Sequence, residues 1–207
     1  MLADLTVREL LNKIAGKDPV PGGGSVAALN GAIASALTSM VANLTIGKKG
    51  YEEHEKVMRK VVEVADDKKE VFIFEIDRDS DAYNHVFDCF KMPKITEEEK
   101  AVRSMAIQEA TKLAATVPMG VARHAYKLME IIETVADYGN KNAVTDACVA
   151  MMCARSAVLG ALMNVRINLG AIKDEEFVAQ FSKEADELEK KTSEKEASLI
   201  EKVKDKL

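Results

Sequence analysis

The chain has 207 residues, 47% of them hydrophobic and 30% charged, a balance that fits one globular domain over residues 1–207 and excludes a disordered chain. Its net charge of -5 arises from intermixed acidic and basic residues, which excludes the basic face that nucleic-acid binding needs. The three cysteines form no CxxC pair and the first residues show no signal-peptide pattern, so we expect a cytoplasmic protein without disulfides.

Helix-forming residues dominate the whole chain, and strand-like alternation is missing. Two prolines and three glycines make residues 17–24 a loop, and Ser25 is the expected N-cap of the helix that follows. Thr96 opens another helix with a capping-box pattern, and Pro118 is expected to end that helix. The expected helices cover about residues 4–15, 25–47, 52–91, 97–118, 119–138, 142–169 and 174 to the end.

These elements predict an all-α helical bundle with a long buried central helix and long antiparallel helices. The segment from Pro19 to Gly47 carries no charge and is long enough to cross a membrane. Polar residues are scattered through it, and we expect no second segment of this kind, so we interpret it as the buried central helix and predict no membrane contact. The last helix has a thin apolar stripe that suits docking on the core or on a partner chain: Phe177, Phe181, Ala185, Leu188, Ile200, Val203 and Leu207.

One acid stands on the apolar face of the predicted helix 52–91. Asp79 follows Ile76 by three residues and precedes Tyr83 by four, within a stripe of Val, Ile and Phe at helical spacing. A carboxylate in such a place needs a partner or a raised pKa, so it is either a structural hydrogen-bonding group or a tuned acid/base. Asp77 lies on a more polar flank with Asp81, where solvent is expected around it.

A seam of small and polar residues follows one face of the predicted helix 142–169. Asp146 and Asn164 on this seam are 18 residues apart, so roughly 27 Å of helix separates them. They cannot both touch one reacting atom, and they serve either helix packing, two ends of an extended ligand, or two sites. The seam consists of Asp146, Ala150, Cys153, Ala157, Gly160, Asn164 and Asn168.

The glycine run Gly22-Gly23-Gly24 precedes the central helix, where exposed backbone N–H groups can hold an anion or a ring carbonyl. A simple tight turn is the alternative. No strand precedes the run and no Gly-Lys-Ser/Thr ending follows it, so neither dinucleotide-binding motif applies. The three histidines show no metal-binding spacing, and we expect no metal.

The run from Pro19 to Ala28 resembles the opening signature of the formiminotetrahydrofolate cyclodeaminase family, which also includes stand-alone bacterial methenyltetrahydrofolate cyclohydrolases. Further segments similar to this family follow in the same order along essentially the whole chain. They are Met40–Lys49, Asp77–Tyr83, Pro93–Lys100, Gly139-Asn140, Thr145-Asp146 and Asn164–Leu169.

The resemblance implies an all-helical homodimer that takes a tetrahydrofolate derivative as its substrate and uses no metal or other cofactor. The expected reaction is conversion of 5-formiminotetrahydrofolate to 5,10-methenyltetrahydrofolate and ammonia by carboxylate acid/base catalysis. Asp79 is the expected general acid/base, since it alone is both on the apolar stripe and inside a family motif. Asp77 and Asp146 are expected to orient or share the proton, and which carboxylate is acid and which is base stays open.

Substrate-binding residues follow from the same resemblance. The glycine loop (Gly22, Gly23, Gly24) with Ser25 is expected to hold the polar edge of the pterin, and Lys48 the glutamate tail. Three asparagines are expected to hydrogen-bond the pterin: Asn43, Asn140 and Asn164. Asn168 is a further expected substrate-binding residue.

Two other functions are also compatible with the sequence. Hydrolysis of 5,10-methenyltetrahydrofolate to the 10-formyl form needs the same pterin site, with water as the nucleophile. A non-catalytic helical interaction protein would use the terminal helix for docking and the polar seam for packing. Polyglutamate preference and sharing of the site between subunits are also open.

Overall fold

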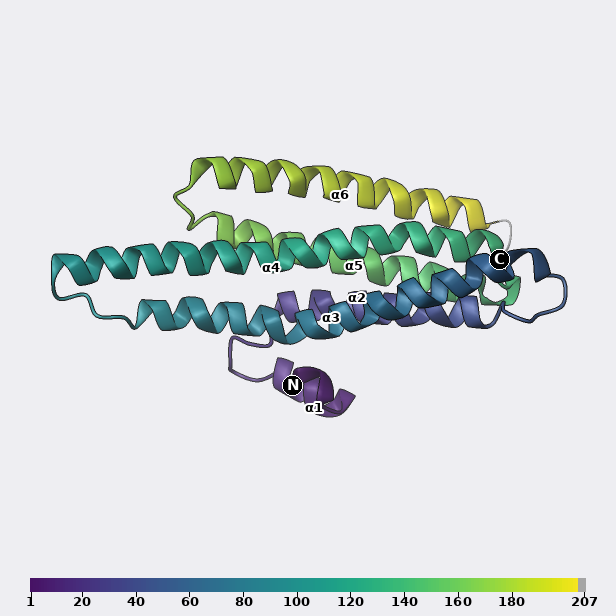
Figure 1. Cartoon of the computed structure of the whole chain (residues 1–207), viewed down its shortest axis with the longest axis horizontal. Coiled ribbons are helices and arrows are strands. Elements are labelled where there is room, and N and C mark those ends of the chain that lie inside the picture. The colour runs from purple at the N-terminus through teal and green to yellow at the C-terminus, as the bar shows by residue number, and fades with distance from the viewer. Residues whose placement is uncertain (205–207) are drawn as a thin grey trace.

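The computed structural model describes residues 1–204, and every regular element in that part of the chain is helical (Figure 1). This confirms the all-α prediction. In chain order the elements are η1 (Leu2–Asp4), α1 (Val7–Ile14), α2 (Gly23–Asn43), η2 (Glu52–His54), α3 (Glu55–Phe90), α4 (Glu97–Tyr138), η3 (Lys141–Ala143), α5 (Val144–Leu169) and α6 (Glu175–Val203).

The core lies between α2, α3, α4 and α5, which run alongside one another (Figure 1). Small residues allow the close approach of these helices. An added Cβ at Gly31 of α2 would lie 2.6 Å from the Phe72 ring of α3, and one at Gly160 of α5 would lie 3.3 Å from the Cβ of Ala27. Because interiors are close-packed, the position of α2 against its neighbours is tightly fixed.

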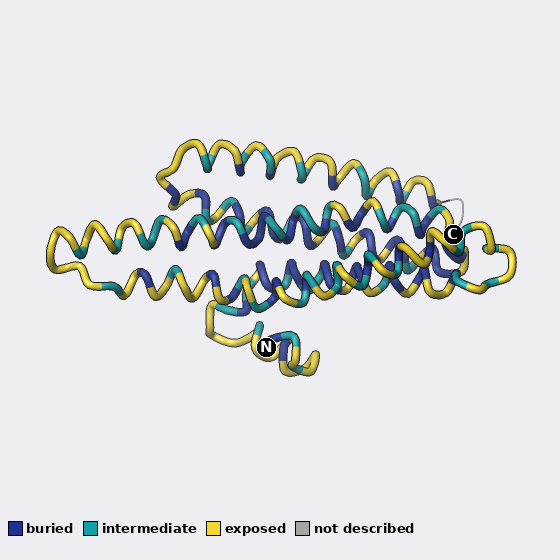
Figure 2. Tube along the Cα trace, in the orientation of Figure 1, coloured by how far each residue is buried: buried dark blue, intermediate teal, exposed yellow. Residues whose placement is uncertain are grey.

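The end of α3 and the start of α4 project beyond the other helices as an antiparallel hairpin (Figure 1). Figure 2 shows that this projection is mostly exposed, whereas the middle of the bundle is buried. The predicted capping box closes the hairpin, because Thr96 Oγ1 accepts from the Glu99 N–H and the Glu99 carboxylate accepts from the Thr96 N–H. The hairpin extends past the point where α2 begins (Figure 1).

The predicted break at Pro118 is wrong, since α4 continues through this residue. A proline has no N–H, so the carbonyl of Ala114, four residues earlier, loses its helical donor. Asn168 of α5 supplies the missing donor, because its Nδ2 lies 3.0 Å from the Ala114 oxygen. A neighbouring helix thus supplies the missing hydrogen-bond donor, which cannot be predicted from the sequence of α4 alone.

The N-terminal segment also differs from the predicted helix 4–15. The turn η1 is followed by a separate helix α1, whose N-cap Thr6 forms a capping box with Glu9 that the sequence analysis missed. The Leu2 N–H donates to Asp77 Oδ1 of α3 at 2.8 Å. This hydrogen bond ties the N-terminus to the outer side of α3.

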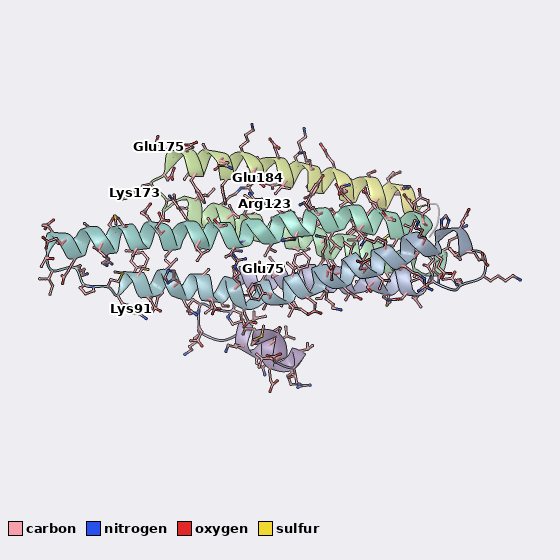
Figure 3. The ribbon with its side chains drawn as sticks, viewed as in Figure 1. Glu75, Lys91, Arg123, Lys173, Glu175 and Glu184 are labelled. Carbon is pink, nitrogen blue, oxygen red and sulfur yellow. The ribbon has the colours of Figure 1, made fainter. Side chains whose placement is uncertain are left out.

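The terminal helix α6 docks on its own chain. Its buried residues Phe181, Ala185, Thr192, Leu199 and Val203 face the bundle. Ion pairs to α4 and α5 flank them, and Figure 3 shows Arg123 of α4 beside Glu184 of α6, joined by two hydrogen bonds of 2.6 Å. The intramolecular alternative for the apolar stripe is therefore confirmed, except at Leu207, which lies outside the described residues.

Two helices are long and apolar enough to cross a membrane by composition alone: Gly23–Asn43, with mean hydropathy 1.5, and Lys141–Leu169, with 1.6. The expectation that only one such segment exists is wrong. Half or more of each window is buried against other helices. Because they pack on each other and on α3 and α4, both serve as core helices of the bundle.

Candidate functional site

A cavity of about 290 Å³ opens where α2 begins, with walls from α3, α4 and α5. The preceding loop, which includes a cis Val20-Pro21 bond, forms one further side. The lining residues are Pro19, Val20, Gly22, Gly23, Gly24, Asp79, Tyr83, Val86, Ala114, Asn164, Ile167 and Asn168.

Asp79 approaches the first turn of α2 so closely that only glycine fits beside it. A Cβ added at Gly24 would lie 2.0 Å from Asp79 Oδ1 and 2.5 Å from Oδ2. The glycine run is therefore more than a turn, because Gly24 admits the carboxyl group to the end of the helix. Its two neighbours line the same cavity.

Burial raises the pKa of Asp79, and hydrogen bonds from the side chain and backbone of Ser25 oppose this effect. The Ser25 hydroxyl lies 2.8 Å from the Ile76 carbonyl oxygen and 3.2 Å from Asp79 Oδ2. A hydroxyl has one proton to donate, and the shorter contact is to a carbonyl that can only accept. That proton goes to the Ile76 carbonyl or to Asp79 Oδ2, and a hydrogen bond from Ser25 to Asp79 stabilises the ionised form of the carboxyl. Burial outweighs these hydrogen bonds, so the pKa of Asp79 stays above its ordinary value.

Ser25 is not the helix N-cap that the sequence predicts. The N-cap is Gly22, and the first helical hydrogen bond runs from the Val26 N–H to the Gly22 carbonyl at 3.1 Å. The amides of the first turn have no acceptor within their own helix and carry the positive end of its dipole. Because Gly22, Gly23 and Gly24 line the cavity, this helix end can bind an anion or a polarised carbonyl there.

The two asparagines of α5 face this cavity but differ in what they offer. Asn164 Nδ2 donates to the Gly160 carbonyl at 2.9 Å and lies beside Gly23. Asn168 Nδ2 donates to both the Ala114 and the Asn164 carbonyls, at 3.0 and 2.8 Å. Both Asn168 amide hydrogens are thus committed to backbone groups, so Asn168 positions α5 against α4 and offers a ligand only its oxygen.

Tyr83 and Ile167 also line the cavity, although neither was predicted as a site residue. Tyr83 was assigned to the core stripe, yet it is 43% exposed and lines the cavity one turn after Asp79. Ile167, 77% exposed, lies opposite on α5. The signal for Tyr83 was its spacing of four from Asp79, which places both on one face of α3. An aromatic ring and an aliphatic side chain at the rim suit a flat ring ligand.

Asp77 does not share the cavity with Asp79. Two residues along a helix point in nearly opposite directions, and Asp77 lines a neighbouring hollow of about 470 Å³. Its Oδ1 accepts from the Leu2 N–H, and its Oδ2 is buried, contrary to the solvated position expected. Tyr83, Pro19 and Val20 line both hollows, so they form the partition between them.

The remaining predicted site residues gather at the opposite end of α2, which is roughly 30 Å long. Asn140 is buried and joins chain segments, because its N–H donates to Thr45 Oγ1 at 2.8 Å and its Nδ2 to the Leu44 carbonyl at 3.2 Å. Near it are Asn43 at the end of α2, Lys48 above the Tyr51 ring, and Asp146 in the first turn of α5. Within one chain these four residues lie far from Asp79.

Among residues 1–204, no group of three or more His, Cys, Asp or Glu side chains is arranged to hold a metal ion. The prediction of a metal-free site stays a prediction. The polar groups that line the cavity are the partly buried carboxyl of Asp79, Tyr83, helix amides and asparagine amides.

The fold and cavity define an all-α protein whose candidate site places one partly buried acid against the glycine end of a helix. The chain belongs to the formiminotransferase-cyclodeaminase family, whose model matches residues 6–187. Its relatives are enzymes, as predicted.

Methenyltetrahydrofolate cyclohydrolase of Methylorubrum extorquens is 38% identical over 188 residues, which are 91% of this chain and 90% of that protein. Formimidoyltransferase-cyclodeaminase of Gallus gallus is 34% identical over 82% of this chain, which spans only 31% of that longer protein. The crystal structure of formiminotetrahydrofolate cyclodeaminase from Thermotoga maritima matches with a TM-score of 0.86 and 33% identity, covering 96% of each chain.

Proposed function

We propose that this protein is a formiminotetrahydrofolate cyclodeaminase, which converts 5-formiminotetrahydrofolate to 5,10-methenyltetrahydrofolate and ammonia. The observation that carries the proposal is Asp79, a carboxyl beside the first turn of α2 whose pKa is raised by burial. The likeness to the Thermotoga maritima cyclodeaminase over 96% of the chain supports it.

The proton balance of the reaction favours such an acid. N10 attacks the formimino carbon, its proton passes to the imino nitrogen, and the resulting amino group leaves. Release of neutral ammonia then requires one additional proton from outside the substrate. A carboxyl whose pKa is raised by burial can donate a proton to the departing nitrogen as a general acid.

The remaining contacts follow from the geometry of the cavity. The amides of Gly23 and Gly24 bind the polar edge of the pterin, and the Tyr83 ring packs against its face. Asn164 offers its oxygen to a ring N–H. Holding N10 against the formimino carbon contributes by proximity as well.

Methenyltetrahydrofolate cyclohydrolase is the second candidate, because a relative of that name is 38% identical over 90% of its length. This reaction adds water to the methenyl carbon and opens the bridge to 10-formyltetrahydrofolate. Hydrolysis releases one proton, so this reaction needs a group that accepts a proton. The ionised form of Asp79 would suit it better than the neutral form.

Purified protein assayed on each substrate separates the two candidates. We expect ammonia release from 5-formiminotetrahydrofolate to exceed hydrolysis of 5,10-methenyltetrahydrofolate, and the reverse result would favour the cyclohydrolase. Asp79→Asn should slow deamination about 100-fold or more, since general acids contribute that much. Asp67→Asn, an exposed site on the same helix, is the matched control and should keep full activity. An Asp79→Asn variant as active as the control would remove Asp79 from the chemistry.

We also propose that the protein forms a homodimer through the outer face of α2 and α5. This face carries no charged residue at its exposed positions, although 30% of the chain is charged. It is contiguous with the cavity through Ile167. Its exposed residues include Ile33, Ala36, Met40, Val149, Met152, Ser156 and Met163. A two-fold axis across its middle would lay the distant end of the partner's α2 over the cavity, which would bring the two groups of family motifs together.

A mixing experiment tests this arrangement. Asp79→Asn and Asp146→Asn protein, each impaired alone, should regain about a quarter of wild-type activity when mixed, since half the dimers then hold one intact site. No gain on mixing would mean that Asp146 does not complete a site in the partner. Met152→Glu should give monomers in sedimentation, and Phe74→Glu, exposed on α3, should not.

A further inference from the structure

Gly120 lies near the middle of α4, where no contact within residues 1–204 explains a glycine. An added Cβ at Gly120 would meet no atom of these residues within 4 Å, whereas one at Gly24 would clash with Asp79 and one at Gly31 with Phe72. A glycine inside a helix costs stability, because it loses more conformational freedom on folding than other residues. The space beside Gly120 is therefore open to a group from outside the chain.

Gly120 belongs to an uncovered face of α4, which we call the α4 stripe. The stripe consists of the positions reached from Thr116 in steps of three and four residues, from Glu98 to Thr134, so they share one face of the helix. None of these positions is buried. Towards the hairpin the stripe carries large apolar side chains in solvent, since Val102 is 53% and Met105 67% exposed. Such a face suits a protein partner.

The charges of the α4 stripe are divided between its two halves. The half before Thr116 holds Glu98 and Glu109, and the half after it holds Arg123 and Lys127. Arg123 is paired with α6 (Figure 3), whereas no acid among residues 1–204 forms an ion pair with the Lys127 ammonium group. The stripe thus has an acidic half, an uncharged middle and a basic half.

Further cations reinforce the basic half. Burial lowers the pKa of Lys68 on α3, and so does the charge of Lys127. Burial and both lysines lower the pKa of His124. Of the charges that border the stripe, Lys112 is held by an acid of α6 at 2.9 Å, and Glu130 lies one residue before the stripe position 131. Like charges that repel one another favour an anionic partner.

An apolar groove of about 560 Å³ adjoins the basic half, between α3 and α4. Ile131 and Thr134 of the stripe line one side, valines of α3 line the other, and Lys56 and Lys60 also belong to its lining. The acidic half of the stripe offers the matching features, which are exposed apolar side chains beside acids. The α4 stripe therefore complements a reversed copy of itself.

We propose that α4 pairs in antiparallel with the α4 of a second copy of this chain, about a two-fold axis at Thr116. The axis crosses the uncharged middle of the stripe, so no charge meets its own copy there. Leu113, which is 41% exposed, lies over the partner's Gly120 and fills the space that a Cβ would occupy. This contact gives the glycine its reason.

The same register matches both ends of the stripe. Glu109 faces the partner's Arg123 and the partner's Lys127, and Val102 lies at the partner's Ile131 beside the groove. The two-fold axis repeats each contact, so the pairing closes at two copies. A single pair of helices buries less surface than a stable interface of about 1,200–2,000 Å², so the pairing should form only at high protein concentration. It uses a different face from the homodimer proposed through α2 and α5.

Sedimentation equilibrium over a series of concentrations tests the pairing. Glu109→Lys and Lys127→Glu each place like charges opposite one another twice, so each should weaken association about tenfold or more. Both positions are exposed, which leaves the fold undisturbed. An equimolar mixture of the two variants should regain wild-type association, because a mixed pair has opposite charges at both ends. The matched control is Lys100→Glu, which reverses an exposed charge of α4 away from the stripe and should change nothing.

Two outcomes would overturn the proposal. Equal masses of wild-type and Glu109→Lys protein at every concentration would exclude the contact, and a mixture that stays weakly associated would exclude the antiparallel register. Met152→Glu separates this contact from the one through α2 and α5. Dilute Met152→Glu protein should be monomeric, and at high concentration it should form dimers that Glu109→Lys removes. Monomers at every concentration would refute the α4 pairing and leave the α2 and α5 contact standing.

Discussion

The repair of α4 at Pro118 predicts a specific coupling between two helices. Asn168→Ala removes the Nδ2 donor that lies 3.0 Å from the Ala114 carbonyl. In the wild-type chain that carbonyl then has no helical donor, because Pro118 has no N–H. In a Pro118→Ala background the new N–H of residue 118 takes over, so the same substitution should cost much less.

The size of the effect follows from the group left unpaired. An unsatisfied buried carbonyl costs about 1–3 kcal/mol, and we expect about 2 kcal/mol here because the hydrogen bond is partly exposed at the cavity. For a chain of this length this corresponds to a fall of about 4–8 °C in melting temperature. In the Pro118→Ala background the cost of Asn168→Ala should drop below about 1 kcal/mol, which leaves a coupling of at least about 1 kcal/mol.

The assay is a double-mutant cycle of urea unfolding followed by circular dichroism, with thermal melts of the same four proteins. Unchanged slopes of the unfolding curves would show that the free energies are comparable. Additive costs, equal in both backgrounds, would refute the view that Asn168 replaces the donor missing at Pro118.

Three further predictions concern the site and its supports. Gly24→Ala should reduce deamination at least about 100-fold, because the added Cβ displaces the Asp79 carboxyl. The control is Gly120→Ala, whose Cβ meets nothing within 4 Å; it should keep activity and stabilise α4 by about 0.5–1 kcal/mol in urea unfolding. Because burial raises the pKa of Asp79, the folded chain holds this proton more tightly than the unfolded chain does. The free energy of unfolding should therefore fall as pH rises from about 4 through the raised pKa. In thermal melts across that range, the melting temperature of Asp79→Asn should fall less than that of the wild-type chain. Arg123→Lys removes the paired hydrogen bonds to Glu184, and since both groups are partly exposed, unfolding should change by less than about 1 kcal/mol.

Local signals in the sequence predicted most of the helices. The capping box at Thr96, the glycines and prolines of residues 17–24 and the apolar periodicity each act within a few residues, so they can be read without the fold. The same locality explains the wrong break at Pro118. The group that rescues the helix there lies on α5, 50 residues further along the chain.

The site was predictable in part, for the same reason. Asp79 was found because a lone acid interrupts an apolar face, and the glycine run because glycines rarely open a helix without cause. Tyr83 was not found. The exposed wall of a cavity is a property of how α3 packs, and periodicity within α3 does not contain it.

The sequence by itself determined the helical class, the family motifs and the presence of an unusual acid, because these depend on residue type and spacing along one chain. Only the tertiary structure decided which of those motifs meet. It placed Gly24, Ser25, Asp79 and Asn164 at one end of α2 and left Asn43, Asn140 and Asp146 at the other. The physical reason is the rigidity of α2, since a straight helix of roughly 30 Å keeps its two ends apart however similar their chemistry.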